Sequence, residues 1–157
     1  MVSGVVLSMS WVELTLDAVR ARLDKVFPGE FLPPRGEGTF VIEGPLAPEQ
    51  YFVNSAIAGA SGTFFLNSVP DRYAEVSNFA NLIADEKLRA LALAQEAWLS
   101  VDLIDSRADP AAASRFICKT LAEFAPPDAV VLVHSYDHTI YFDAGVRERL
   151  ASGTSPL

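Results

Sequence analysis

The sequence contains few of the residues that form disulfides or bind metals in small secreted domains, with one cysteine and two histidines. Cys118 is its only cysteine, so no disulfide can form within the chain, and nothing marks an oxidising compartment. Cys118 lies in the middle of a predicted helix, where a buried apolar role is expected for it rather than a reactive one. A reducing, cytoplasmic location is the expectation that follows.

Positive charge is also scarce. The 157 residues include 12 basic and 20 acidic side chains, a net charge of −8, and no two basic residues are adjacent, Arg147 and Arg149 forming a short pair. Phosphate backbones and anionic membrane surfaces would be repelled on average. We therefore expect neither a nucleic acid nor a membrane as a partner, and the acidic surface favours a basic protein partner.

Long apolar runs are missing as well. No uninterrupted apolar stretch approaches the roughly 20 residues that span a bilayer. The apolar residues 2–14 are interrupted by Ser8, Ser10 and Glu13 and lack a basic leader, which argues against a signal peptide. Since 50% of the residues are nevertheless apolar, we expect one folded domain over residues 1–152, with a flexible tail over residues 153–157.

Two periodicities alternate along the chain. Residues 4–11 and 97–104 alternate between apolar and other side chains, the pattern of half-buried strands. A helical pattern follows each, capped by Thr15 and by Asp109 with proline after it. The other predicted elements are strands over residues 39–42, 51–57, 62–69, 129–134 and 139–143, one or two helices beginning at Asp71 and Asp85, and a short helix over residues 144–150.

The two halves of this order are alike, because each opens with a Leu-Ser strand and continues into an amphipathic helix. This pattern predicts an α+β fold with two layers, a mainly antiparallel sheet with helices on one face. Duplicated βαββ units, an arrangement of the ferredoxin-like type, would account for the repetition. Partners usually bind the uncovered face of such a sheet.

A family resemblance accompanies this pattern. The fragments Gly4-Val5-Val6-Leu7, Ala97-Trp98-Leu99-Ser100-Val101-Asp102 and Ala129-Val130-Val131-Leu132-Val133-His134 occur in this order and separation. They resemble bacterial α+β families described as domains of unknown function, of the kind found near toxin-immunity genes. The resemblance covers most of the chain through strand-like motifs. It implies a binding protein and carries over no functional residue.

Polar and aromatic side chains share one face of the predicted strands. Trp98, Ser100 and Asp102 project from one strand, and Ser8 and Ser10 project from its counterpart in the first half. Together they could floor a cleft with an aromatic platform and several polar groups. The alternative is that another element or a second subunit covers this face. The leading hypothesis is a non-enzymatic protein-binding domain, immunity-type or regulatory, without a cofactor, and a homodimer is a further alternative.

The two histidines support a competing hypothesis. His134 and His138 flank a predicted hairpin turn that also contains Asp137. Two imidazoles and a carboxylate across a hairpin mouth could bind a metal or a small ligand, which would make the protein a sensor or an enzyme. The spacing matches no helical zinc signature, and turns often contain histidine and aspartate. A solvated turn therefore remains the other interpretation.

Overall fold

The computed structural model describes residues 2–28, 50–55, 62–103, 109–134, 139–142 and 145–152. The strands are β1 (Val2–Ser8), β2 (Gln50–Ser55), β3 (Gly62–Val69), β4 (Ala97–Leu103), β5 (Val131–His134) and β6 (Thr139–Phe142). The helices are α1 (Leu16–Val26), α2 (Val76–Phe79), the 3-10 turn η1 (Ala80–Leu82), α3 (Glu86–Ala94), α4 (Pro110–Phe124) and α5 (Val146–Ala151).

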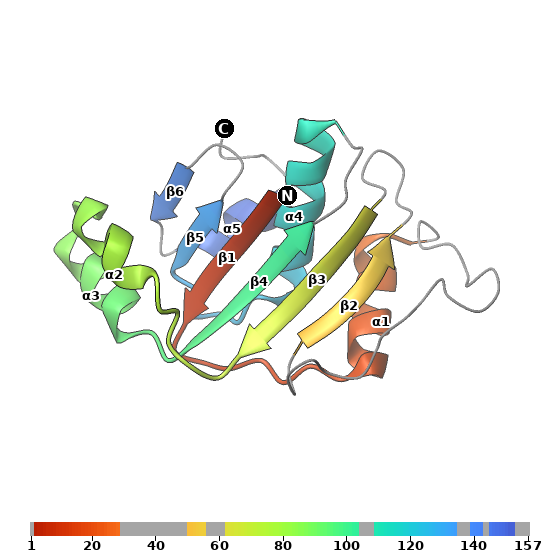
Figure 1. Ribbon diagram of the computed structural model, residues 1–157, viewed down its shortest axis with the longest axis horizontal. Helices are drawn as coiled ribbons and strands as arrows, with labels where there is room; N and C mark the ends of the chain where they lie inside the picture. Colours follow the sequence, from red (N-terminus) through yellow and green to blue (C-terminus); the bar gives the residue numbers. More distant parts are fainter. Residues whose placement is uncertain are drawn as a thin grey trace.

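The six strands form one sheet in the order β2-β3-β4-β1-β5-β6, and every neighbouring pair is antiparallel (Figure 1). The α+β class and the antiparallel sheet predicted from the sequence are therefore confirmed. Residues 39–42, predicted as a further strand, and the predicted tail at residues 153–157 lie outside the described residues. The single domain over residues 1–152 stays a prediction.

The two central strands, β1 and β4, open the two halves of the chain. Because β4 is antiparallel to both β1 and β3, those two strands run in the same direction on either side of it. Likewise β4 and β5 run in the same direction on either side of β1. A strict βαββ repeat would place β2 beside β4, as β5 lies beside β1, but β3 occupies that position. The β2–β3 hairpin therefore pairs with the central strands through its second strand, β3, whereas the β5–β6 hairpin does so through its first strand, β5.

Local sequence signals account for most helix starts. The side chains of Thr15, Asp85 and Asp109 each accept a hydrogen bond from the backbone N–H three residues later, as expected for N-caps. The predicted cap at Asp71 is wrong, because α2 begins only at Val76 and the Asp71 carboxylate instead accepts a hydrogen bond from the adjacent Arg72 N–H at 2.7 Å. The segment that follows is two short helices joined by η1.

One face of the sheet packs against α1, α4 and α5. Its side chains on β1, β3 and β4 are mainly apolar, and those of Leu66, Leu99 and Val101 are at most 2% exposed. On the helix side, the Phe116 ring stacks against Phe27 with centroids 5.2 Å apart and meets Phe64 edge-on at 5.0 Å. Burial of each such large side chain contributes about 1.5–3 kcal/mol, so this layer is the main source of stability.

Helices also cover part of the other face. The side chains of Val5 and Leu7 form a second buried cluster with residues of α2, η1 and α3, whose members there are Val76, Phe79, Ile83, Leu88 and Ala92. The prediction of helices on one face only is therefore wrong. The physical reason lies in β1, where Val5, Val6 and Leu7 are consecutive apolar residues, so both of its faces must leave water.

Candidate functional site

The polar side chains of Asn67, Ser100 and Asp102 hydrogen-bond to one another on the face of the sheet opposite α1, α4 and α5. Asn67 on β3 lies opposite Ser100 on β4. The Asn67 Nδ2 donates to the Ser100 Oγ and to an Asp102 Oδ2, both at 2.8 Å, and the Ser100 hydroxyl donates to the same Asp102 oxygen at 2.9 Å. We call these residues the polar triad. Since Asn67 and Ser100 are buried, the triad hydrogen-bonds within the fold.

Trp98 lies further along the same face and is covered from one side by Tyr73. The two rings meet edge-on with centroids 5.4 Å apart. The carbonyl of Tyr73 accepts a hydrogen bond from the Nε2 of the fully buried Gln95 at 3.5 Å, so the chain before α2 is fixed over the tryptophan. Burial raises the pKa of the Tyr73 phenol, and the charges of Glu75 and, to a smaller extent, Asp102 raise it further.

The structure separates the predicted serines from Trp98. Ser8 pairs with Ala97 in the β1–β4 register, so its side chain lies on the face covered by α1, α4 and α5. Its hydroxyl donates to the Ser10 carbonyl at 2.8 Å. Ser10 lies beyond the end of β1. The predicted grouping of Ser8 and Ser10 with Trp98, Ser100 and Asp102 is therefore wrong. Leu7 is the residue opposite Trp98, and this register places Ser3 opposite Asp102.

The histidine hairpin cannot be placed as a site. His134 is the last residue of β5, and its backbone pairs with Gly4 and with Thr139. Asp137 and His138 lie outside the described residues. No three potential metal ligands of the His, Cys, Asp or Glu types come together within the described ranges. The metal hypothesis for His134, Asp137 and His138 stays a prediction.

The residues that sequence reasoning missed are two exposed apolar side chains just beyond β1. Met9 is 43% exposed and Trp11 is 42% exposed. The alternating pattern predicts that both belong to the first strand, but β1 ends at Ser8 and residues 11–15 form neither helix nor strand. The signal that could have found this end is the polar pair Ser8 and Ser10, which interrupts the apolar run.

This segment is held in place by side chains from elsewhere in the fold. The Met9 N–H donates to the Asp128 carboxylate at 3.1 Å, and the Ser68 hydroxyl donates to the carbonyl of Val12. The exposed Glu96 also donates its N–H to the carbonyl of Ser8 at 3.0 Å, directly before Met9. The two apolar side chains are thus presented by a fixed backbone.

Acidic residues contact or follow the backbone of this segment. Glu13 follows Trp11 by two residues and is exposed, and the Asp128 and Glu96 contacts add two more acidic residues. We define the Trp11 edge as Met9, Trp11, Glu13, Glu96 and Asp128. It combines two large apolar side chains, of types that are enriched in protein interfaces, with three acidic residues.

The fold and these sites define an α+β protein with a polar group inside the sheet and an apolar, acidic edge. No protein-family model, curated protein or solved structure matches the chain. Across the described ranges, no helix has both the length and the apolar character needed to cross a bilayer, and the longest, α4, has 15 residues.

Proposed function

We propose that this protein is a non-enzymatic protein-binding domain, regulatory or of the immunity type, and that its partner contacts the Trp11 edge. The observation that carries the proposal is the pair of large apolar side chains, Met9 and Trp11, each more than 40% exposed on a segment fixed by hydrogen bonds. Tryptophan and methionine are enriched in protein interfaces, and tryptophan is prominent among the residues that dominate binding energy.

Preorganisation supports the same assignment. A partner that buried Trp11 would not have to order the backbone beneath it, because Asp128 and Ser68 already hold residues 9 and 12. The conformational cost of binding is correspondingly smaller. By contrast, the polar triad has its hydrogen bonds satisfied inside the sheet, so we assign Ser100 and Asp102 the role of fixing the β3–β4 pairing.

The partner surface we propose is basic. Glu13, Glu96 and Asp128 belong to the same edge, and the whole chain carries a net charge of −8. Complementary charge at the rim of an interface accelerates association and excludes wrong partners more than it adds affinity. Raising the salt concentration should therefore slow association while leaving the apolar contact intact.

For the fold, we propose a ferredoxin-like duplication in which β1-α1-β3 and β4-α4-β5 are the repeated units. This assignment is supported because β1 and β3 run in the same direction, as do β4 and β5. Strands β2 and β6 are then additions at the two edges of the sheet. A circular permutant opened between α3 and β4, with its original termini joined by a linker of about 10 residues, should then unfold cooperatively. Loss of the cooperative transition would contradict self-contained units.

The binding proposal is tested by parallel captures from a lysate of the native cell. The tagged wild type, a Trp11→Ala variant and a Leu82→Ala variant are compared at equal amounts. Leu82 is a matched control, because it is a large apolar side chain that is 68% exposed on η1. A stoichiometric basic partner retained by the wild type and Leu82→Ala, and lost by Trp11→Ala, is the expected result.

The other outcomes are equally informative. Recovery of the same partner by Trp11→Ala would place the interface elsewhere, and the absence of any stoichiometric partner would count against a binding function. Sizing chromatography over a range of concentrations tests the homodimer alternative. Self-association that Trp11→Ala abolishes would make a second copy the partner at this edge.

A further inference from the structure

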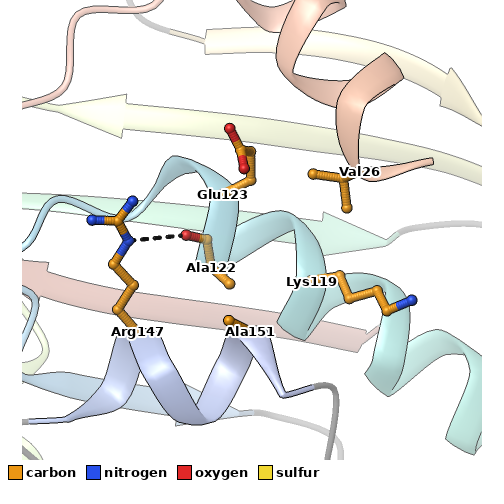
Figure 2. A pocket seen from close by; sticks show the side chains of 6 residues that line it. All are labelled: Val26, Lys119, Ala122, Glu123, Arg147 and Ala151. Carbon is orange, nitrogen blue, oxygen red and sulfur yellow. Dashed lines mark hydrogen bonds between the residues drawn. The ribbon is translucent and has the colours of Figure 1, made fainter. Parts of the chain in front are cut away.

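A groove of about 310 Å³ lies between α1, α4 and α5, the helices that cover the sheet face opposite Trp98. Its walls come from the end of α1, the second half of α4 and α5. Figure 2 shows Arg147 and Lys119 at opposite ends, with the methyl groups of Ala122 and Ala151 between them. Val26 and Glu123 complete the lining. The volume is at the lower end of the range for ligand sites, about 300–1,000 Å³.

The negative charge in this lining is compensated from outside the groove. The Glu123 carboxylate contacts Lys25 Nζ at 2.9 Å and Arg22 Nε at 3.5 Å, both on α1. The backbone carbonyl of Glu123 also accepts a hydrogen bond from Arg22. Two cations thus face one carboxylate, so Glu123 does not neutralise the groove.

Among the residues that the structure describes, no carboxylate pairs with the positive charges at the two ends. Arg147 Nε donates to the carbonyl of Ala122 at 3.4 Å, a neutral acceptor at the end of α4. Lys119 is exposed and makes no ion pair with any residue that the structure describes. The groove therefore presents an ammonium and a guanidinium group separated by an apolar floor.

The whole layer of α1, α4 and α5 has an excess of positive charge, like the groove. Helices α1, α4 and α5 contain seven basic and four acidic residues, a net charge of +3. That leaves five basic and sixteen acidic residues for the rest of the chain, a net charge of −11. Local fields of one sign raise the local concentration of oppositely charged ligands. An anion is attracted to this layer although the protein as a whole is acidic.

We propose that this groove, the α4–α5 groove, binds an acidic peptide segment of a protein partner, with carboxylates on Lys119 and Arg147 and a small apolar side chain over Ala122 and Ala151. An extended peptide fits two cations at opposite ends better than a compact anion does. A nucleic acid fits less well, because its regularly spaced phosphates would extend beyond this layer onto the acidic remainder of the chain.

The test uses a fluorescein-labelled peptide in which two glutamates flank two alanines, together with the same peptide carrying glutamine in place of glutamate. Fluorescence anisotropy measures the Kd of each for the full chain. The variants are Lys119→Gln and Arg147→Gln, with Arg115→Gln as the matched control, since Arg115 is an exposed cation on α4 outside the groove lining.

The acidic peptide should bind measurably and weaken with added salt, and each groove variant should raise its Kd about threefold to tenfold, the range between exposed and partly desolvated ion pairs. Arg115→Gln should change the Kd less than twofold. If Arg147→Gln loses helix content by circular dichroism, the test rests on Lys119→Gln, because Lys119 is exposed and its replacement leaves packing unchanged.

Three results would overturn the proposal. One is equal affinity for the glutamate and glutamine peptides, and another is an unchanged Kd in Lys119→Gln. The third is tighter binding of a labelled single-stranded oligonucleotide, which would assign the groove to nucleic acid. None of these results depends on the Trp11 edge, so the groove and the proposed function fail separately.

Discussion

Beneath α1 and α4, the sheet presents mainly apolar side chains, and aromatic rings such as Phe116 pack against it. On the opposite face, the same strands carry an apolar cluster at one end and the polar triad further along. The comparison separates two tasks. The first face supplies most of the burial, whereas the second fixes the strand pairing through hydrogen bonds, and the exposed Trp11 edge belongs to neither packed layer.

The largest expected effect compares one phenylalanine from each cluster. Phe116→Ala should lower the free energy of unfolding by about 4–5 kcal/mol, the upper part of the range for buried phenylalanine, because the packed rings of Phe27 and Phe64 hinder collapse of the cavity. Phe79→Ala should cost about 3 kcal/mol, because α2 has only four residues and can move into the space. Guanidinium unfolding measures both, and equal losses would remove the distinction between the clusters.

Next in size is the polar triad. Asp102→Ala removes the acceptor that Asn67 and Ser100 share, which should cost about 1–3 kcal/mol because buried donors lose a partner. Asp102→Asn keeps one acceptor oxygen and should cost less. Asp24→Ala, an exposed change on α1, is the control and should stay within about 0.5 kcal/mol. If Asp102→Ala matched this control, the triad would have no role in fixing the sheet.

A smaller effect concerns the pH dependence of the second face. The pKa of the Tyr73 phenol is raised, so the folded state holds this proton more tightly than the unfolded state does. The contribution to stability is fully present below about pH 10, the ordinary tyrosine pKa, and is lost as the pH rises through the folded-state pKa. Absorbance titration at alkaline pH, with Tyr73→Phe subtracted, measures this pKa.

Asp102 provides the control for that titration. Its charge is the smallest of the causes that raise the Tyr73 pKa, so Asp102→Asn should lower this pKa slightly. Glu75→Gln should lower it more, since Glu75 contributes both charge and a hydrogen bond. A Tyr73 pKa at its ordinary value in the wild type would show that the ring is not held against Trp98.

The smallest effect is expected on the helix side. Burial raises the pKa of the Cys118 thiol above its ordinary value. Since the thiolate is the reactive form, Cys118 should react with Ellman's reagent only as fast as the protein unfolds. Rapid labelling of the native protein, faster than unfolding measured in parallel, would mean that the helix layer opens locally.

Local signals predicted much of this fold, and long-range pairing accounts for what they missed. The caps at Thr15, Asp85 and Asp109 depend on neighbouring residues, so sequence reasoning found them. The placement of Ser8 away from Trp98 depends on the β1–β4 register, in which a shift by one residue exchanges the faces. Asn67 joined the site only because β3 lies beside β4, a pairing that no local pattern specifies.

The packing of α2, η1 and α3 against β1 differs from the predictions for a different reason. Consecutive apolar residues Val5, Val6 and Leu7 already indicated burial on both sides of β1, although the alternation of Ser8 and Ser10 suggested a half-exposed strand. The alternating pattern does not reveal the Trp11 edge, because it continues to residue 11, beyond the end of β1 at Ser8. Where a strand ends depends on its partners, and β4 offers no partner beyond Ala97.

The most direct test of the account is the Kd of the captured partner for the wild type and for Trp11→Ala, measured together with the free energy of unfolding of each. We predict that the Kd rises at least about tenfold, as expected for a central interface tryptophan, while the stability of the folded protein changes little. An unchanged Kd in a Trp11→Ala variant of wild-type stability would contradict the proposal that the partner binds at the Trp11 edge.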